Sequence, residues 1–204
     1  MEFQEVVKSR RSIRKFTSQE VSDECIDLIL EAARQAPSGV NCQPWRFVMV
    51  KSEKFRHQFA QVTPMPFVYQ APVIFVCCAD LDAAHQEKLA QRARELIEAG
   101  AFAGTPLEDF DPESYASNSA MEKEAAKNYL RLNTAIAIEH MALQATDLGL
   151  GSCWVMLFSR KKVKELLDLD DKYEPVVLLP VGYPAQNPPS RPRLSKQEIL
   201  LREL

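Results

Sequence analysis

Residues 73–79 read VIFVCCA and form the longest unbroken hydrophobic run in the chain. Such a run predicts a strand that is buried on both faces. It is too short to cross a membrane as a helix, which needs about 20 apolar residues. Because neighbouring side chains of a strand point to opposite faces, Cys77 and Cys78 are not expected to pair. The run therefore predicts a strand in a folded core, and we expect no membrane span.

The rest of the chain alternates between strand-like and helical patterns. Three further apolar stretches, residues 46–50, 152–157 and 175–181, predict strands. Residues 101–119 hold Gly, Pro, Asp and Ser and predict a mobile loop. Helices mixed with short apolar strands predict a layered α+β or α/β domain. Helices are expected over residues 2–9, from Ser22 to the breakers at Pro37, over 83–99, 122–148 and 161–169, and as a final turn within 195–204.

The expected helix over residues 122–148 is the longest element, about 40 Å at 1.5 Å per residue. Gly149 follows it and is typical of a C-terminal helix cap. Residues 135–138 read AIAI, so this part of the helix is apolar around much of its surface. A helix of that kind is buried in a core or in a subunit interface.

Length, charge and cysteine content exclude several classes of protein. The 204 residues fit one domain, or one domain with an arm. A net charge of −3 argues against a nucleic-acid binder that works by bulk charge. Five cysteines and three histidines without CxxC or HxxxH spacing give no reason to expect a disulfide framework or a metal site. The first residues, MEFQE, are acidic and lack an apolar signal segment, so we expect a cytoplasmic protein.

A basic segment stands out against this acidic background. Its arginines suit phosphate oxygens, and Ser12 can add a hydroxyl donor. A confined anion pocket and a solvated helix end both remain open as interpretations. The segment places five cations within eight residues without an acid among them: Lys8, Arg10, Arg11, Arg14 and Lys15.

A second basic cluster, Arg191 and Arg193, follows Gly182 in a Pro-rich segment that we expect to extend as an arm. The alternative is an exposed tail. Neither GxGxxG nor GxxxxGK[ST] occurs in the sequence, so a bound phosphate has to be held by side chains. Two arginine clusters at opposite ends of the chain together favour an anion site.

Two further segments could carry chemistry. Residues 36–45 read APSGVNCQPW, and their small, amide and hydroxyl groups could face a flat polar heterocycle. The alternative is a plain connection with Trp45 in the core. Cys42 has no nearby histidine and is expected to be buried rather than reactive. Residues 151–156 read GSCWVM and favour a buried strand with Trp154 as packing.

Taken together, these segments resemble the nitroreductase-like flavoprotein family. The resemblance runs from about residue 3 to residue 201. It implies a three-layer α+β fold with a mostly antiparallel sheet flanked by helices. It also implies a homodimer with one FMN in each of two interface sites. The matching motifs are RRSIR at 10–14, APSGVNCQPW at 36–45, LGLGSCWV at 148–155, LPVGYP at 179–184 and RPR at 191–193.

The resemblance also implies how the chain is divided. Residues 1–182 would form the FMN-binding domain, with a variable lid at 82–125 that covers the substrate. Residues 183–204 would be the C-terminal arm of the same domain and would wrap around the partner subunit. Many family members carry Pro-Ile-Glu-Gly where this chain reads WVML at 154–157, so the contact to flavin N5 stays open.

Carried over residue by residue, the motifs imply a cofactor site. Arg11 would contribute on the ribityl side, and Arg14 would lie near the N1–C2=O edge and tune the flavin potential. Trp154 and Val155 would cover one ring face. The phosphate would be held by Arg10, Ser12, Arg191 and Arg193. The partner subunit would supply Pro37, Ser38 and Gly39, with Asn41 and Gln43 lining the ring or its approach.

The implied activity is ping-pong hydride transfer. NADH or NADPH would reduce the flavin at N5, and a nitroaromatic, quinone or similar small oxidant would then take two electrons. No catalytic side-chain acid or base is required, because the cofactor supplies the chemistry. Alternatives are a specialised enzyme of the same fold, of the reductive dehalogenation or flavin-cleavage type, a non-catalytic flavin sensor, and a structural dimer without cofactor.

Overall fold

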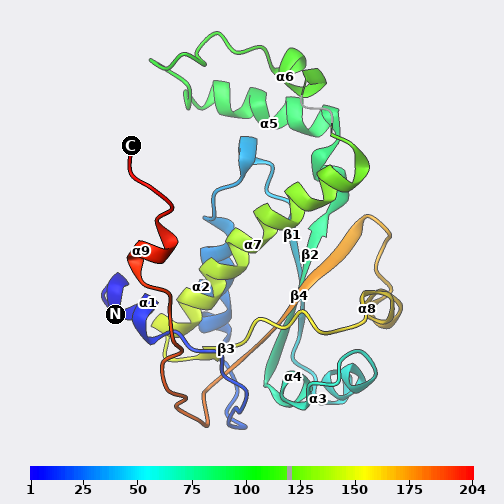
Figure 1. The fold of residues 1–204 in the computed structure, drawn as a ribbon. Helices are drawn as coiled ribbons and strands as arrows, with labels where there is room; N and C mark the ends of the chain where they lie inside the picture. The colour runs from blue at the N-terminus through cyan, green and yellow to red at the C-terminus, as the bar shows by residue number, and fades with distance from the viewer. Residues whose placement is uncertain (119–120) are drawn as a thin grey trace.

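Strand β2 (Val73–Asp80) lies inside the sheet, as the apolar run predicts. The computed structural model describes residues 1–118 and 121–204, without the side chains of residues 115 and 118. Within these residues the sheet is antiparallel, with the order β1-β2-β4-β3 (Figure 1). The remaining strands are β1 (Trp45–Val50), β3 (Gly151–Ser152) and β4 (Tyr173–Gly182).

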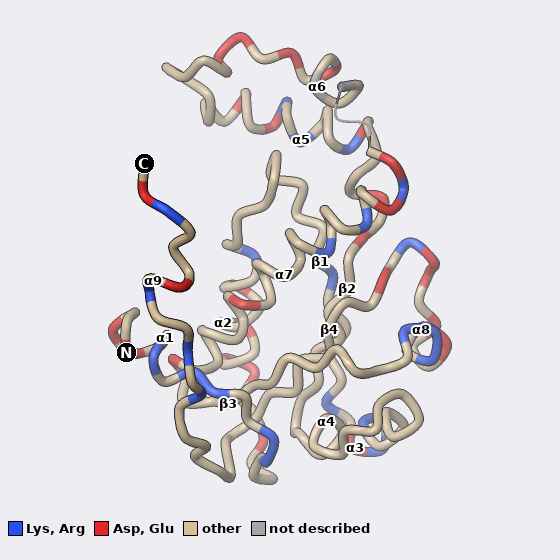
Figure 2. Tube along the Cα trace, in the orientation of Figure 1, with Lys and Arg blue, Asp and Glu red and all other residues tan. Residues whose placement is uncertain are grey.

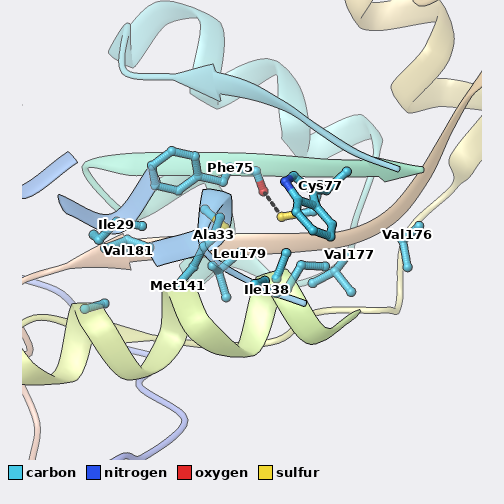
Figure 3. Close-up of a cluster of buried hydrophobic side chains, with 14 of the residues drawn as sticks. Ile29, Ala33, Phe75, Cys77, Ile138, Met141, Val176, Val177, Leu179 and Val181 are labelled. Atoms are coloured by element: carbon cyan, nitrogen blue, oxygen red, sulfur yellow. Dashed lines mark hydrogen bonds between the residues drawn. The ribbon is translucent and has the colours of Figure 1, made fainter. Parts of the chain in front are cut away.

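Both faces of β2 are buried, and its side chains alternate between two hydrophobic clusters. Phe75 and Cys77 point to the first cluster, with Ile29 of α2 (Asp23–Arg34) and Met141 of α7 (Lys123–Asp147) (Figure 3). Cys78 points to the second cluster, which is covered by α3 (Glu53–Arg56), α4 (Pro66–Gln70) and α8 (Arg160–Leu167). The sheet therefore lies between two helical layers, which confirms the predicted three-layer α+β fold and the opposite orientation of the two cysteines.

Helix α7 is the predicted long helix and runs across one face of the sheet (Figure 1). Ala137 and Ile138 are buried, whereas the neighbouring Ala135 and Ile136 are half-buried. The helix ends at Asp147, and just beyond it Gly149 has a φ of +74°, the left-handed conformation expected of a glycine that follows a helix. Helix α2 begins as predicted, because the Ser22 hydroxyl accepts a hydrogen bond from the backbone of Cys25.

The prediction of a mobile loop over residues 101–119 is wrong for residues 112–118, and residue 119 lies outside the described residues. Turns over residues 100–109 lead into helix α6 (Pro112–Asn118), which packs against α5 (Gln86–Glu98). The Asp111 carboxylate accepts hydrogen bonds from the backbone of Glu113 and Ser114 and so caps the helix. Arg94 of α5 also pairs with Glu113. The composition of this segment is typical of a loop and gives no sign of α6, which the Asp111 cap and the contact with α5 stabilise.

The predicted strand over residues 152–157 is also wrong in length, because β3 ends at Ser152. The register with β4 continues, since Val155 forms an isolated bridge to Leu178. Between these points Cys153 faces Pro180, which accepts its hydrogen bond but has no N–H to return. The proline therefore interrupts the ladder that the apolar pattern predicts.

Three short helices between β1 and β2 carry no signal in the sequence pattern. They are α3, η2 (His57–Gln61) and α4, each of five residues or fewer. Elements of one turn are too short to show helical periodicity. Two further 3-10 helices lie in the connections: η1 (Gly39–Asn41) lies between α2 and β1, and η3 (Leu81–Ala84) lies between β2 and α5.

The two ends of the chain meet on one side of the molecule (Figure 1). Helix α1 (Phe3–Ser9) packs on α7, and the segment after β4 runs back past α1 to a short helix, α9 (Lys196–Ile199). The side chains of Phe3, Leu201 and Leu204 are exposed. No helix within the described residues is long and apolar enough to span a bilayer. The cytoplasmic location stays a prediction.

Candidate functional site

A cavity of about 300 Å³ lies where the two ends of the chain meet. We call it the basic cavity. Figure 2 shows the basic segment after α1 beside the basic part of the arm. No acidic residue is among the described residues that line the cavity. Its lining consists of Val7, Lys8, Arg10, Arg11, Ser190, Arg191 and Arg193.

Backbone pairing brings the arm to this place. Phe16 and Pro184 form an antiparallel bridge, and the amide of Thr17 donates to the carbonyl of Tyr183 at 2.9 Å. The amide of Ala185 donates to the carbonyl of Lys15 at 2.8 Å. The arm is thus aligned with the segment that follows α1. This alignment confirms that the two arginine clusters, far apart in sequence, are neighbours in space.

The cations of the basic cavity are held in different ways. Arg10 lies 3.6 Å from a carboxylate oxygen of Glu139 on α7. Arg193 bonds only locally among the described residues, to the carbonyl of Pro192 at 3.3 Å. The guanidinium of Arg11, in contrast, donates to two carbonyls at the end of α1 and to Ser190. Arg10, Arg191 and Arg193 therefore keep most of their donors for a bound anion.

Beyond the cavity, the basic segment runs along β3. Ser12 forms a parallel bridge with Ser152, and the amide of Ile13 donates to the Ser152 carbonyl at 2.9 Å. Burial raises the pKa of the Cys153 thiol, while the charge of Arg14 and a hydrogen bond from Ser12 act in the opposite direction. Ser12 and the exposed Arg14 therefore lie close to the segment of Cys153 and Trp154.

Trp154 and Val155 face different environments. Val155 is buried in the second core cluster, and its amide donates to the Leu178 carbonyl at 3.0 Å. Its side chain and its N–H are therefore both engaged in the sheet. Trp154 is half-buried on the opposite side, and its indole Nε1 has no hydrogen-bond partner among the described residues. Both residues are predicted to contact the flavin ring. Of the two, only Trp154 has a side-chain donor, its indole N–H, that no group of the described chain uses.

The segment of residues 37–43, which we call the η1 loop, adopts a costly backbone conformation. Val40, Asn41 and Gln43 have φ values of +49°, +53° and +43°. This left-handed region disfavours residues other than glycine, and most of all a β-branched one. The Ser38 hydroxyl accepts a hydrogen bond from the amide of Gln43 at 3.0 Å and closes the loop on itself.

Helix α7 holds the η1 loop in place through the side chain of Asn133. The buried Asn133 side chain accepts a hydrogen bond from the Gly39 amide at 2.8 Å and donates to the carbonyl of Tyr129 at 2.8 Å. A Cβ atom at Gly39 would lie 2.1 Å from the hydroxyl of Tyr129, so a larger residue there requires the Tyr129 side chain to move. Burial raises the pKa of the Cys42 thiol, although hydrogen bonds with Tyr129 and Ser38 oppose the effect. Cys42 is thus a packed residue, as predicted.

The structure does not bring all predicted site residues together. Pro37, Ser38, Gly39, Asn41 and Gln43 lie on the η1 loop, which packs against α5 and α7. None of them lines the basic cavity. Within one chain the η1 loop and the basic cavity are therefore separate places.

Three residues that the sequence analysis does not single out contribute to the basic cavity or to the η1 loop. Ser190 stands beside the predicted Arg191, but serine in a Pro-rich arm gives no signal of its own. Glu139 and Asn133 lie on α7, where a single polar residue in a long helix is most often solvated. Their contacts arise only when α1 and the η1 loop are packed against that helix.

Comparison with known proteins connects this geometry to a family. The model of the nitroreductase family matches residues 7–183. The chain belongs to the nitroreductase family. Residues 7–183 include the η1 loop and the whole basic segment, whereas residues 184–204 of the arm lie outside the match.

The chain is also similar to individual proteins over most of its length. An FMN reductase [NAD(P)H] of Bacillus subtilis is 29% identical over 96% of this chain and 72% of its own length. An iodotyrosine deiodinase of Thermotoga neapolitana is 28% identical over 97% and 95%. The crystal structure of a nitroreductase family protein from Streptococcus pneumoniae has a TM-score of 0.81, with 28% identity over 99% of this chain and 100% of that one.

No group of three or more His, Cys, Asp or Glu side chains in the described ranges is placed to hold a metal ion.

Proposed function

We propose that this protein is an FMN-dependent oxidoreductase that uses NADH or NADPH to reduce small oxidants such as nitroaromatics and quinones. The observation that carries the proposal is the basic cavity. It gathers arginines from both ends of a chain that belongs to the nitroreductase family. The FMN reductase of Bacillus subtilis supports the choice of cofactor.

The donor set of the basic cavity fits a phosphate group. Arginine forks bind phosphate oxygens in pairs, and the described lining holds cations and a hydroxyl without an opposing acid. In the proposal Arg10, Arg191 and Arg193 hold the phosphate of FMN, with Ser12 as a hydroxyl donor. Each charged hydrogen bond contributes about 1.5–3 kcal/mol.

The segment beside the basic cavity would then hold the flavin ring. Arg14 would stand at the edge of the ring that gains negative charge on reduction, and a cation there raises the reduction potential. The Trp154 side would face the ring, because Val155 is engaged in the sheet. When bound, FMN supplies hydride transfer at N5, and the side chains supply binding, orientation and electrostatics.

A partner subunit would complete each site. The η1 loop shares no residue with the basic cavity of its own chain, so we assign it to the cofactor of a second copy. The exposed apolar side chains of Phe3, Leu201 and Leu204 would be covered in such a homodimer, with the arm of residues 183–204 extended onto the partner. Light scattering of the purified protein measures this directly: a mass of one chain would contradict the assignment.

The absorption spectrum of the purified protein tests the proposed function. We expect a yellow protein whose flavin band disappears after anaerobic addition of NADH or NADPH and returns when a nitroaromatic or a quinone is added. The nucleotide that reacts faster is the donor. A yellow protein that neither nucleotide bleaches would favour a flavin sensor. A protein that stays colourless after incubation with FMN would contradict the proposal.

The Thermotoga neapolitana relative favours one alternative, a reductive dehalogenase of the same fold. In that case the region of residues 82–125 would recognise a specific halogenated ligand. Reduced protein mixed anaerobically with an iodinated tyrosine would then regain its flavin band and release iodide. Reoxidation by the nitroaromatic alone would leave the first proposal in place.

A further inference from the structure

We propose that Arg11 is a positioning residue that fastens the C-terminal arm, rather than a residue that binds the anion itself. This inference rests on the proposed function, because it explains how the arm arginines are held beside Arg10. It also revises the role that the family resemblance gives to Arg11, a contact on the ribityl side of the flavin. The inference comes from the hydrogen bonds of one side chain.

The guanidinium of Arg11 is already occupied. Nη1 donates to the carbonyl of Lys8 at 2.6 Å and to that of Arg10 at 2.8 Å. Nη2 donates to the Ser190 hydroxyl at 2.5 Å. The Nε atom is buried and has no hydrogen-bond partner among the described residues. Little of this side chain is left for a phosphate, unlike those of Arg10 and Arg193.

The contact with Ser190 holds a long segment. Across the described chain it is the one hydrogen bond or ion pair that joins residues 186–204 to the rest of the protein. The last backbone contact before it is the bond from Ala185 to Lys15. Residues 186–204 also include no buried side chain. Without the bond to Ser190, nothing else of this kind keeps Arg191 and Arg193 beside Arg10.

Physical chemistry favours this division of roles. Arg191 and Arg193 are repelled by the other cations of the cavity when the anion is absent, so an anchor that adds no further charge to the arm is needed to hold them there. Ser190 is directly next to Arg191, and its hydroxyl is an acceptor that adds no charge. The two carbonyls at the end of α1 accept from Arg11, and cations are favourable at that end of a helix. Arg11 thus links the end of α1 to the arm through a fork that lysine does not possess.

The test compares Arg11→Lys, Ser190→Ala and their double variant with the unchanged holoprotein. Affinity is measured from free-flavin fluorescence on serial dilution of protein loaded with FMN or with riboflavin, which lacks the phosphate. Hydrogen exchange of residues 183–204 reports the arm itself. Arg34→Lys, an exposed arginine paired with Glu31, and Ser18→Ala, an exposed serine, are the matched controls.

We expect each single variant to weaken FMN binding about 3- to 10-fold, which is the size of one ordinary exposed hydrogen bond, because the contact acts on the anion only through the arm. Riboflavin binding should stay unchanged, and exchange in the arm should become faster. The double variant should have the same affinity for FMN as the single variant with the lower affinity, because both substitutions remove the same contact. The controls should match the unchanged protein.

Two results would overturn the inference. If Arg11→Lys weakens FMN binding while Ser190→Ala does not, Arg11 contacts the anion directly. If neither variant changes FMN binding or arm exchange, another contact holds the arm. Arg10→Ala separates this failure from that of the proposed function. If it weakens FMN and riboflavin equally, the phosphate is bound elsewhere, and both the phosphate assignment and the role of Arg11 are wrong.

Discussion

The basic cavity and the η1 loop are built in opposite ways. The cavity gathers cations on exposed segments, where two unit charges 4 Å apart repel by about 1 kcal/mol in water. The η1 loop holds three residues with positive φ, each at a cost of about 1–2 kcal/mol, and is fixed by the buried Asn133. The cavity brings together like charges that a bound anion would offset, whereas the loop has its strained shape without any ligand. In the proposed homodimer, a cofactor between the cavity of one subunit and the loop of the other would meet one wall of exposed cations and one wall of fixed backbone.

The largest effect is expected from Arg10→Ala combined with Arg193→Ala. Each change removes a charged contact of about 1.5–3 kcal/mol, so FMN should be lost on dialysis while riboflavin affinity is unchanged. The free energy of unfolding without flavin should not fall, because like charges have been removed. Flavin content and urea unfolding measure the two quantities. Full retention of FMN would show that the cavity does not hold the phosphate.

Gly39→Ala tests the rigidity of the η1 loop. The new Cβ would lie 2.1 Å from the Tyr129 hydroxyl, and overpacking of this kind lowers the free energy of unfolding by about 3 kcal/mol. Urea unfolding of the protein without flavin measures the loss. Adding Tyr129→Phe removes the atom that clashes and should restore part of it. If Gly39→Ala alone is neutral, the η1 loop is not rigid and the comparison fails.

Asn133→Ala removes the anchor of the η1 loop without adding bulk. It leaves the Gly39 amide without its acceptor, and we expect a loss of about 2 kcal/mol in the free energy of unfolding. Asn128→Ala, at an exposed position of the same helix, is the control and should stay within about 0.5 kcal/mol. FMN release should become faster in the Asn133 variant if the loop reaches the cofactor of the partner. Equal losses in both variants would speak against an anchor.

The smallest effect concerns two buried thiols, one in the η1 loop and one beside the basic segment. Burial raises the pKa of Cys42 in the η1 loop and of Cys153 beside the basic segment. A raised pKa stabilises the folded protein below the unfolded pKa near 9, and this contribution is lost as the pH rises above it. Each thiol accounts for at most about 1.4 kcal/mol per pH unit. Urea unfolding at pH 8 and pH 10 should show a smaller decrease in Cys42→Ala and Cys153→Ala; a slope identical to that of the unchanged protein would contradict the assignment.

Much of the fold follows from local sequence pattern. The run at residues 73–79 gives a strand buried on both faces, and Ser22 and Gly149 give the ends of two helices. These features depend on residues close to each other in sequence, so periodicity and capping chemistry are sufficient to predict them. The family resemblance adds the order of the layers, which the antiparallel sheet between two helical layers confirms.

The predictions fail where a distant residue decides the local structure. Pro180 on β4 interrupts the pairing that the apolar pattern of residues 152–157 predicts. Arg94 on α5 helps to hold α6 in a segment whose composition is typical of a loop. In both cases the deciding contact belongs to another element of the chain. Composition within a window does not contain it.

The sequence by itself determined that arginines stand at both ends of the chain and that side chains, not a glycine-rich loop, have to hold an anion. Only the tertiary structure decided which partners each arginine has. Arg10 and Arg11 are neighbours of the same type, and no local rule separates them. The packing of α1 against α7 and the return of the arm place Ser190 against Arg11 and Glu139 against Arg10. A side chain's role depends on which partners reach its donors, and those partners come from elements far away in sequence.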